Sequence, residues 1–162
     1  LISIPKGLTG GFLPMGITLA KETIFQSFIS DSPKKTFWHG HSFTANPLGC
    51  AAANASLDLL EKDPIKYLSF EEKHLFHLKK IKKLPFVKNI RVTGTIAAFD
   101  IEIGKNEGYL NNVGKRIKAL SIKKGLFIRP LGNVIYLLPP LCITDKQLEK
   151  SYRIIFEILS DL

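Results

Sequence analysis

Lys6 is the side chain in this sequence whose surroundings most favour covalent chemistry. A short apolar run, residues 1–5, ends at Lys6, and three glycines follow within five residues, at Gly7, Gly10 and Gly11. A lysine amine at the end of a strand, beside a glycine-rich turn that leaves room for a ligand, can form a Schiff base with a carbonyl compound. The alternative is an ordinary solvated lysine, which is what most lysines are. Two later segments favour the first interpretation.

These two segments combine polar side chains with turn-forming residues. Residues 37–53 read FWHGHSFTANPLGCAAA, and residues 128–140 read IRPLGNVIYLLPP. Together with the KGLTGG run at residues 6–11, they resemble the class III aminotransferases, which depend on pyridoxal phosphate and have fold type I. The resemblance covers nearly the whole chain, with the segments in the same order and at similar spacing. The third segment resembles in particular the branch of this family that acts in biotin biosynthesis.

The resemblance implies cofactor-binding roles for residues of the first two segments. Lys6 would be the catalytic residue, binding pyridoxal 5'-phosphate and substrate through its amine and moving a proton between carbon atoms. His41 and Ser42 would bind the cofactor, and the Ser42 hydroxyl would reach the phosphate from the partner subunit of a homodimer. Gly40 would lie beside the substrate, where a missing Cβ leaves room. Pro5 departs from the family pattern, which more often has Ser or Gly, and removes an amide donor from the turn.

The resemblance also implies how the substrate is bound. Arg129 would pair with the carboxylate of an oxo acid, since a planar guanidinium can make two parallel hydrogen bonds to it, and Tyr136 would lie near the same pocket. The implied acceptor is 8-amino-7-oxononanoate, which becomes 7,8-diaminononanoate, and the implied amino donor is S-adenosylmethionine. Another class III enzyme, acting on acetylornithine, 4-aminobutyrate or a related ω-amine, stays open, although the segment from Arg129 to Pro140 argues against it. Without these segments, a surface arginine and a core tyrosine would be the ordinary interpretations.

The first part of the chain must position Lys6 and the 37–53 segment. We expect a strand at residues 1–4, a buried strand at 13–20 and a short helix at 21–29. A long loop at 30–46 should carry the aromatic and histidine side chains, because loops of this length in compact domains are usually functional or disordered. Asn46 and Pro47 should then begin a helix that runs to about residue 60, since Asn is a good N-cap and Pro suits the first helical position.

The composition changes near residue 62, where charged residues become frequent. We expect helices at about 64–83 and 109–124, with strands at 87–92, 96–103, 126–129 and 134–138. Thr144 and Gln147 form a capping-box pattern that should open a final helix. The sequence therefore predicts an α/β protein. Residues 1–62 would be the C-terminal part of a large cofactor-binding domain, and residues 63–162 a small C-terminal domain.

The formal net charge of +9 raises the question of nucleic-acid binding. The basic residues cluster at 79–83 and 115–124 without interleaved aromatics, and the second cluster lies beside a helical apolar stripe, so a solvated helix face is favoured. A non-catalytic basic module that binds nucleic acid or a partner protein stays an alternative.

Cys50 and Cys142 are expected to be small core residues, and His74 and His77 are expected to have no partners. We expect no metal site, no membrane span and a cytoplasmic protein.

Some parts of the implied active site have no counterpart in this sequence. Family members hold the pyridine nitrogen with an acidic residue and stack an aromatic side chain on the ring, and both belong to the part of the enzyme before the lysine. We therefore expect the chain to be the C-terminal part of a longer enzyme, and we expect the 162 residues alone to have little or no activity.

Overall fold

The computed structural model describes residues 1–64, 68–103 and 112–162 and divides the chain into two compact units. Unit 1 comprises residues 1–64 and unit 2 comprises residues 65–162. The sequence places the domain boundary at residue 62. The assignment of the two units to a large and a small domain of a longer enzyme remains a prediction.

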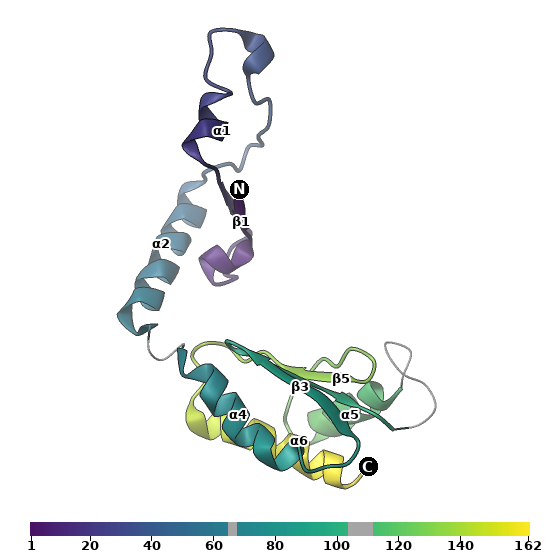
Figure 1. Cartoon of the computed structure of the whole chain (residues 1–162). Coiled ribbons are helices and arrows are strands. Elements are labelled where there is room, and N and C mark those ends of the chain that lie inside the picture. The colour runs from purple at the N-terminus through teal and green to yellow at the C-terminus, as the bar shows by residue number, and fades with distance from the viewer. Residues whose placement is uncertain (65–67, 104–111) are drawn as a thin grey trace. The chain divides into compact units, whose positions relative to one another are not determined.

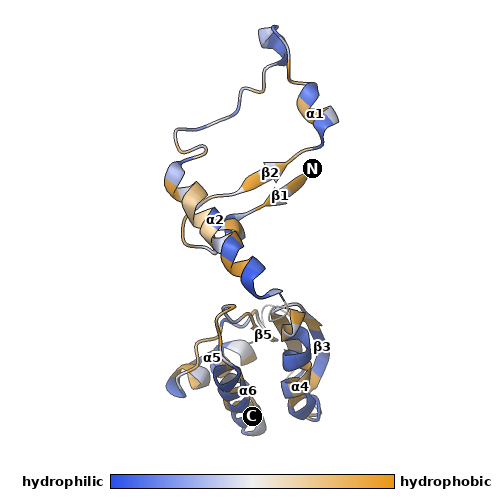
Figure 2. Cartoon of the chain, turned by 90° about the vertical axis from the view of Figure 1, so that its left-hand side faces the viewer, coloured by the Kyte–Doolittle hydropathy of each residue, from blue (hydrophilic) through white to orange (hydrophobic). Residues whose placement is uncertain are grey.

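Unit 1 begins with a small antiparallel sheet, and Lys6 lies in the segment that connects its two strands. Strand β1, Ile2–Ile4, pairs with β2, Ile17–Leu19, and the 3-10 helix η1, Lys6–Thr9, follows β1. The prediction of a buried strand at 13–20 is wrong in length and in burial, since Leu19 is 50% exposed. Within the described residues β1 pairs only with β2, and Ile2 and Leu19 are 61% and 50% exposed although both strands are hydrophobic (Figure 2).

A short helix, a loop and a long helix complete unit 1. Helix α1 spans Glu22–Gln26, the 3-10 helix η2 spans Pro33–Lys35, and α2 spans Pro47–Lys62. The side-chain oxygen of Asn46 accepts a hydrogen bond from the amide of Gly49 at 2.8 Å. The predicted N-cap is therefore confirmed, and it satisfies one of the amides that have no partner within the helix. Helix α2 packs against η1, which supports the turn that carries Lys6.

Unit 2 contains a three-stranded antiparallel sheet in the order β3-β4-β5. The strands are β3, Val87–Thr93, β4, Ile96–Ile101, and β5, Val134–Leu137; the helices are α4, Phe70–Ile81, α5, Val113–Lys123, and α6, Asp145–Ser160. Helices α4 and α6 pack side by side against one face of the sheet (Figure 1). The core of unit 2 includes Phe99, Ile117 and Ile155, which have no exposed surface. Each such side chain contributes about 1.5–3 kcal/mol on burial.

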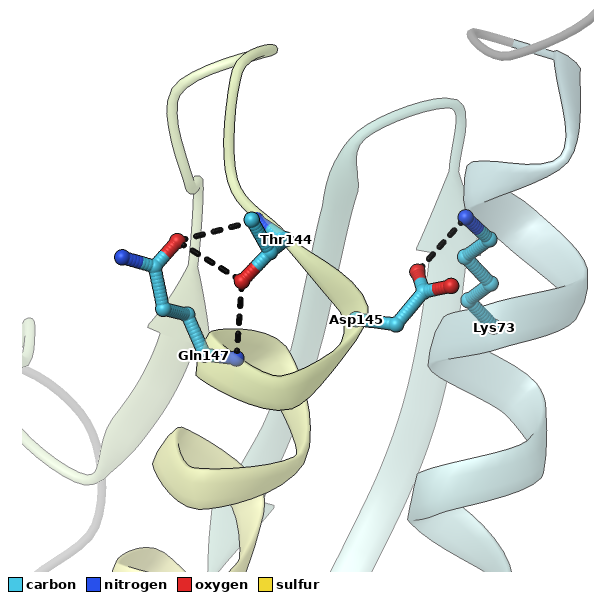
Figure 3. Close-up of polar contacts among 4 residues, drawn as sticks. All are labelled: Lys73, Thr144, Asp145 and Gln147. Atoms are coloured by element: carbon cyan, nitrogen blue, oxygen red, sulfur yellow. Dashed lines mark hydrogen bonds and ion pairs between the residues drawn. The ribbon is translucent and has the colours of Figure 1, made fainter.

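Helix α6 begins as its sequence predicts, with a complete capping box (Figure 3). The Thr144 hydroxyl accepts the Gln147 amide at 3.3 Å, and the Gln147 side-chain oxygen accepts the Thr144 amide at 2.9 Å. The Asp145 carboxylate pairs with the ammonium of Lys73 on α4 at 2.7 Å. This exposed ion pair joins the first turn of α6 to α4, but pairs of this kind contribute little to stability.

The strand expected at residues 126–129 is absent. The Leu126 amide donates to the Ser121 carbonyl at 2.9 Å and is therefore used in the turn that ends α5. Pro130 has no amide to donate, and strand-like pairing begins only at Leu131, which bridges to Val134. The first residues of the expected helices at 64–83 and 109–124 lie partly outside the described residues, at 65–67 and 109–111.

Two expectations about polar side chains are also wrong. Cys142 is exposed and Cys50 is half-buried, so neither is a fully buried core residue. His74 is fully buried and has two partners, the Tyr152 hydroxyl on α6 and the Thr95 carbonyl oxygen just before β4. Both reach His74 because α4 packs against α6 and against β4. The helical stripe of α5 is confirmed: Ile117 is buried, while Lys115 and Arg116 are exposed.

Candidate active site

In unit 1, Lys6 lies at a cavity of about 380 Å³. Its side chain is exposed at the start of η1, immediately after β1, and His41 lines the same cavity. The His41 segment is a turn in which the Phe43 amide donates to His41 Nδ1 at 3.2 Å. Gly40 and Ser42 are exposed nearby in sequence but do not line this cavity. The structure therefore brings Lys6 and His41 to one cavity, which Ser42 does not line.

Thr9 organises the turn that presents Lys6, and the sequence did not single it out. Its side chain is only 3% exposed. The hydroxyl oxygen lies 3.1 Å from the Lys6 carbonyl oxygen and 2.6 Å from the Leu13 carbonyl oxygen, and it accepts the Leu13 amide at 3.3 Å. A threonine inside a glycine-rich run is the signal that could have found it, because Ser and Thr hydroxyls often bond to nearby backbone in turns.

In unit 2, Arg129 and Tyr136 line a second cavity, of about 350 Å³. Most of its remaining lining is apolar, and includes Phe127, Leu138 and Ile143. A cavity of this kind can accept a long aliphatic chain with a carboxylate at one end, because the guanidinium pairs with the carboxylate while the alkyl chain leaves water. The arginine and the tyrosine of the segment from Arg129 to Pro140 thus lie at the same cavity.

Strand β5 and the preceding turn determine where these two side chains lie. Ile135 and Leu137 are buried in the core, so the alternation of the strand places Tyr136 on the opposite face of the sheet, where it pairs in register with Ala98. Arg129 precedes Pro130, which restricts it to extended backbone. Arg129 is exposed, and within the described parts of the chain no hydrogen bond or ion pair holds its guanidinium.

A buried polar cluster in unit 2 lies apart from this cavity. His74 Nδ1 is 2.6 Å from the Tyr152 hydroxyl, and His74 Nε2 is 3.1 Å from the Thr95 carbonyl oxygen. A carbonyl can only accept, so Nε2 carries the proton and the Tyr152 hydroxyl donates to Nδ1. The His77 ring stacks on Tyr152, with ring centroids 5.0 Å apart.

Burial shifts the titration of all three groups in this cluster. It lowers the pKa of His74, an effect that the hydrogen bond to Thr95 partly opposes and the charge of His77 adds to. Burial also lowers the pKa of His77 and raises the pKa of Tyr152. Neutral forms are therefore favoured, and the cluster is a structural link between α4, α6 and β4.

The described residues contain neither a candidate metal site nor a candidate membrane span. Among them, no group of three or more His, Cys, Asp or Glu side chains is arranged to hold a metal ion. None of the helices within residues 1–64, 68–103 and 112–162 is long and apolar enough to cross a membrane.

The class of protein follows from comparison with a known family. The family model described as Aminotransferase class-III matches residues 1–159, and the chain belongs to this family. The predicted resemblance to class III aminotransferases is thereby confirmed, and members of this family depend on pyridoxal phosphate.

Several similar proteins carry the name of one particular enzyme. The chain is 48% identical, over all of its length, to the adenosylmethionine-8-amino-7-oxononanoate aminotransferase of Synechococcus elongatus. It is 33% identical, over 99% of its length, to the protein of that name from Methanocaldococcus jannaschii. The chain spans only 38% and 36% of the length of these two relatives.

Solved structures agree with the fold prediction. The crystal structure of the Methanocaldococcus jannaschii enzyme matches 98% of the chain with a TM-score of 0.88 at 32% identity, and the match covers 38% of that structure. An acetylornithine aminotransferase from Elizabethkingia anophelis matches 99% of the chain with a TM-score of 0.79 at 28% identity, over 40% of its own length. The predicted α/β fold of this enzyme class is confirmed.

Proposed function

We propose that the chain forms the C-terminal part of an aminotransferase of biotin biosynthesis. The enzyme would move an amino group from S-adenosylmethionine to 8-amino-7-oxononanoate and release 7,8-diaminononanoate. The observation that carries this proposal is the cavity that joins Arg129 and Tyr136 to an apolar lining, because the acceptor is a long aliphatic chain that ends in a carboxylate. The names of the most similar relatives support the same substrates.

Lys6 would hold pyridoxal phosphate and move the proton. Its amine is exposed at a cavity of about 380 Å³, and a Cβ built at the neighbouring Gly7 would meet nothing within 4 Å. These features fit a planar cofactor beside the lysine. When bound, the cofactor supplies an electron sink that stabilises negative charge on the substrate carbon. The Lys6 amine would take a proton from one carbon and return it at another.

The second segment would complete the cofactor site. His41 lines the Lys6 cavity and would contact the cofactor, and Gly40 would leave room for the substrate. Ser42 is exposed and lies outside that cavity, which suits a hydroxyl that serves the phosphate of a partner subunit. A homodimer with a shared phosphate site is thus part of the proposal, as is the assignment of units 1 and 2 to a large and a small domain.

Arg129 would bind the carboxylate of the acceptor, and Tyr136 would close the same pocket. The guanidinium has no partner within the described residues that a substrate would need to displace. The ring-binding acidic and aromatic side chains of the family belong to a part of the enzyme before Lys6, so we propose that residues 1–162 alone have little or no activity.

The test uses the whole enzyme that contains this chain, with pyridoxal phosphate added. Turnover of 8-amino-7-oxononanoate with S-adenosylmethionine as donor, and its loss in Lys6→Ala, would support the proposal. Turnover with acetylornithine or 4-aminobutyrate alone would contradict the biotin-pathway substrates. Absence of any transaminase activity, together with salt-sensitive binding of DNA or RNA, would favour the basic binding module instead.

A further inference from the structure

The turn that follows Arg129 is held against helix α5 by direct backbone contact. Gly114 lies buried in the first turn of α5. A Cβ built on Gly114 would lie 2.1 Å from the Gly132 carbonyl oxygen and 2.9 Å from Pro130 Cβ. Both distances are far inside van der Waals contact, and the nearer atom belongs to rigid backbone. Any side chain at position 114 must therefore push residues 130–132 away from the helix.

Asn133 holds the same turn from its other side. It is 8% exposed, and its side-chain amide donates to the Ile101 carbonyl oxygen at 3.2 Å. The Ile101 amide donates to the Asn133 carbonyl oxygen at 2.9 Å. Leu131 and Val134 exchange two further backbone hydrogen bonds, of 2.9 and 3.0 Å. The turn is thus fixed to the end of β4 as well as to α5.

This double attachment matters for Arg129 because, among the described residues, its guanidinium has no hydrogen-bond or ion-pair partner. Only the backbone on which it stands, together with packing in the cavity, sets its direction. Pro130 follows immediately and transmits little rotation, since its φ is fixed. A shift of the Pro130–Gly132 turn therefore becomes a shift of the Arg129 side chain at the cavity that it shares with Tyr136.

We propose that Gly114 and Asn133 are positioning residues for carboxylate recognition. They hold the turn at residues 130–133 so that Arg129 meets the substrate carboxylate in a two-bond geometry. This inference rests on the proposed function of Arg129, and it adds two residues that touch neither substrate nor cofactor. Planar pairing of this kind is lost with a displacement of about 1 Å, which can lower the rate about 100-fold.

The experiment compares 8-amino-7-oxononanoate with its methyl ester in the whole enzyme. The measured quantity is the ratio of kcat/KM for the acid to kcat/KM for the ester. Gly114→Ala is expected to lower this ratio about 10- to 100-fold, mainly through KM for the acid. Lys115→Ala is the matched control, since Lys115 is the next residue of α5 and is exposed. It should leave the ratio unchanged.

A second variant tests the positioning role in case Gly114→Ala misfolds. Asn133→Ser loosens the turn without adding a side chain near α5, and it is expected to lower the ratio in the same direction. A double-mutant cycle with Arg129→Ala separates positioning from general damage: in the Arg129→Ala enzyme, neither substitution should lower the ratio further. A purely structural role would instead reduce turnover of acid and ester equally.

The outcomes for this inference and for the proposed function are separable. If the wild-type enzyme prefers the acid and Arg129→Ala loses that preference, the role of Arg129 stands. Unchanged ratios in Gly114→Ala and Asn133→Ser would then overturn the positioning role alone. If the wild-type enzyme shows no preference for the acid, or Arg129→Ala keeps it, both the carboxylate role of Arg129 and this inference fail.

Discussion

The Thr9 hydroxyl oxygen lies 3.1 Å from the carbonyl oxygen of Lys6 and 2.6 Å from that of Leu13. One buried side chain therefore joins the start of the Lys6 turn to its end. The lysine amine itself is exposed at its cavity, so its position depends on this backbone more than on side-chain contacts. The hydrogen bonds of Thr9 therefore bear directly on the proposed role of Lys6.

Replacement of Thr9 by Val should loosen this turn. Val keeps the shape but removes the hydroxyl, which leaves the Leu13 amide and carbonyl without this partner and costs about 1–3 kcal/mol. We expect lower kcat in the whole enzyme and weaker retention of pyridoxal phosphate, measured after gel filtration. Thr9→Ser is the control and should behave nearly as wild type. Equal cofactor retention in Thr9→Val and Thr9→Ser would contradict the role of this hydroxyl.

Arg129→Lys should weaken binding of the oxo acid while leaving the fold intact. Lysine keeps the positive charge but cannot make two parallel hydrogen bonds to a carboxylate, so KM for 8-amino-7-oxononanoate should rise about 10-fold or more. Steady-state kinetics of the whole enzyme measure this. Arg116→Lys, at an exposed position of α5, should leave KM unchanged. The same KM in wild type and Arg129→Lys would contradict the proposal that Arg129 binds the substrate carboxylate.

Tyr152→Phe should destabilise unit 2 by about 1–3 kcal/mol, because it removes the donor that satisfies the buried His74 Nδ1. Hydrogen exchange of core amides, such as that of Ile155, reports the free energy of opening. The double variant with His74→Leu should cost less than the sum of the two single variants, since both remove the same hydrogen bond. Additive costs would show that the two side chains do not depend on each other.

The same cluster predicts that unit 2 loses stability in mild acid. Burial lowers the pKa of His74 and of His77, so the unfolded chain binds protons before the folded one as the pH falls below about 6.5. Stability is then complete above that pH and is lost as the pH falls toward the lowered pKa values. Hydrogen exchange at about pH 7.5 and about pH 5.5 would measure the loss. The variant His74→Gln should show a smaller loss, and a gain of stability in acid would contradict this assignment.

Local signals predicted the helix starts well. Asn46 with Pro47, and Thr144 with Gln147, each specify an N-cap through residues within one turn of one another, and both caps form. The structure places Arg129 and Tyr136, from one of the three segments that resemble the family, at one cavity, and Lys6 and His41, from the other two, at another.

Contacts between distant residues could not be predicted in the same way. His74 meets Tyr152, which is 78 residues away in sequence, and nothing near His74 indicates this partner. The close approach of Gly114 to Gly132 results from the packing of α5 against the turn at residues 130–132, and no local sequence pattern indicates it. The expected strand at residues 126–129 fails because pairing needs a neighbour with free backbone groups, and the Leu126 amide is already bound to Ser121.

The role of Lys6 can be tested by finding which lysine of the whole enzyme binds pyridoxal phosphate. The enzyme would be incubated with the cofactor, reduced with borohydride to make the link permanent, digested and sequenced by mass spectrometry. We expect the pyridoxyl group on the peptide that contains Lys6, and none on any lysine of Lys6→Ala. Stoichiometric labelling of a different lysine, or no labelling of the folded wild-type enzyme, would contradict the proposed role of Lys6.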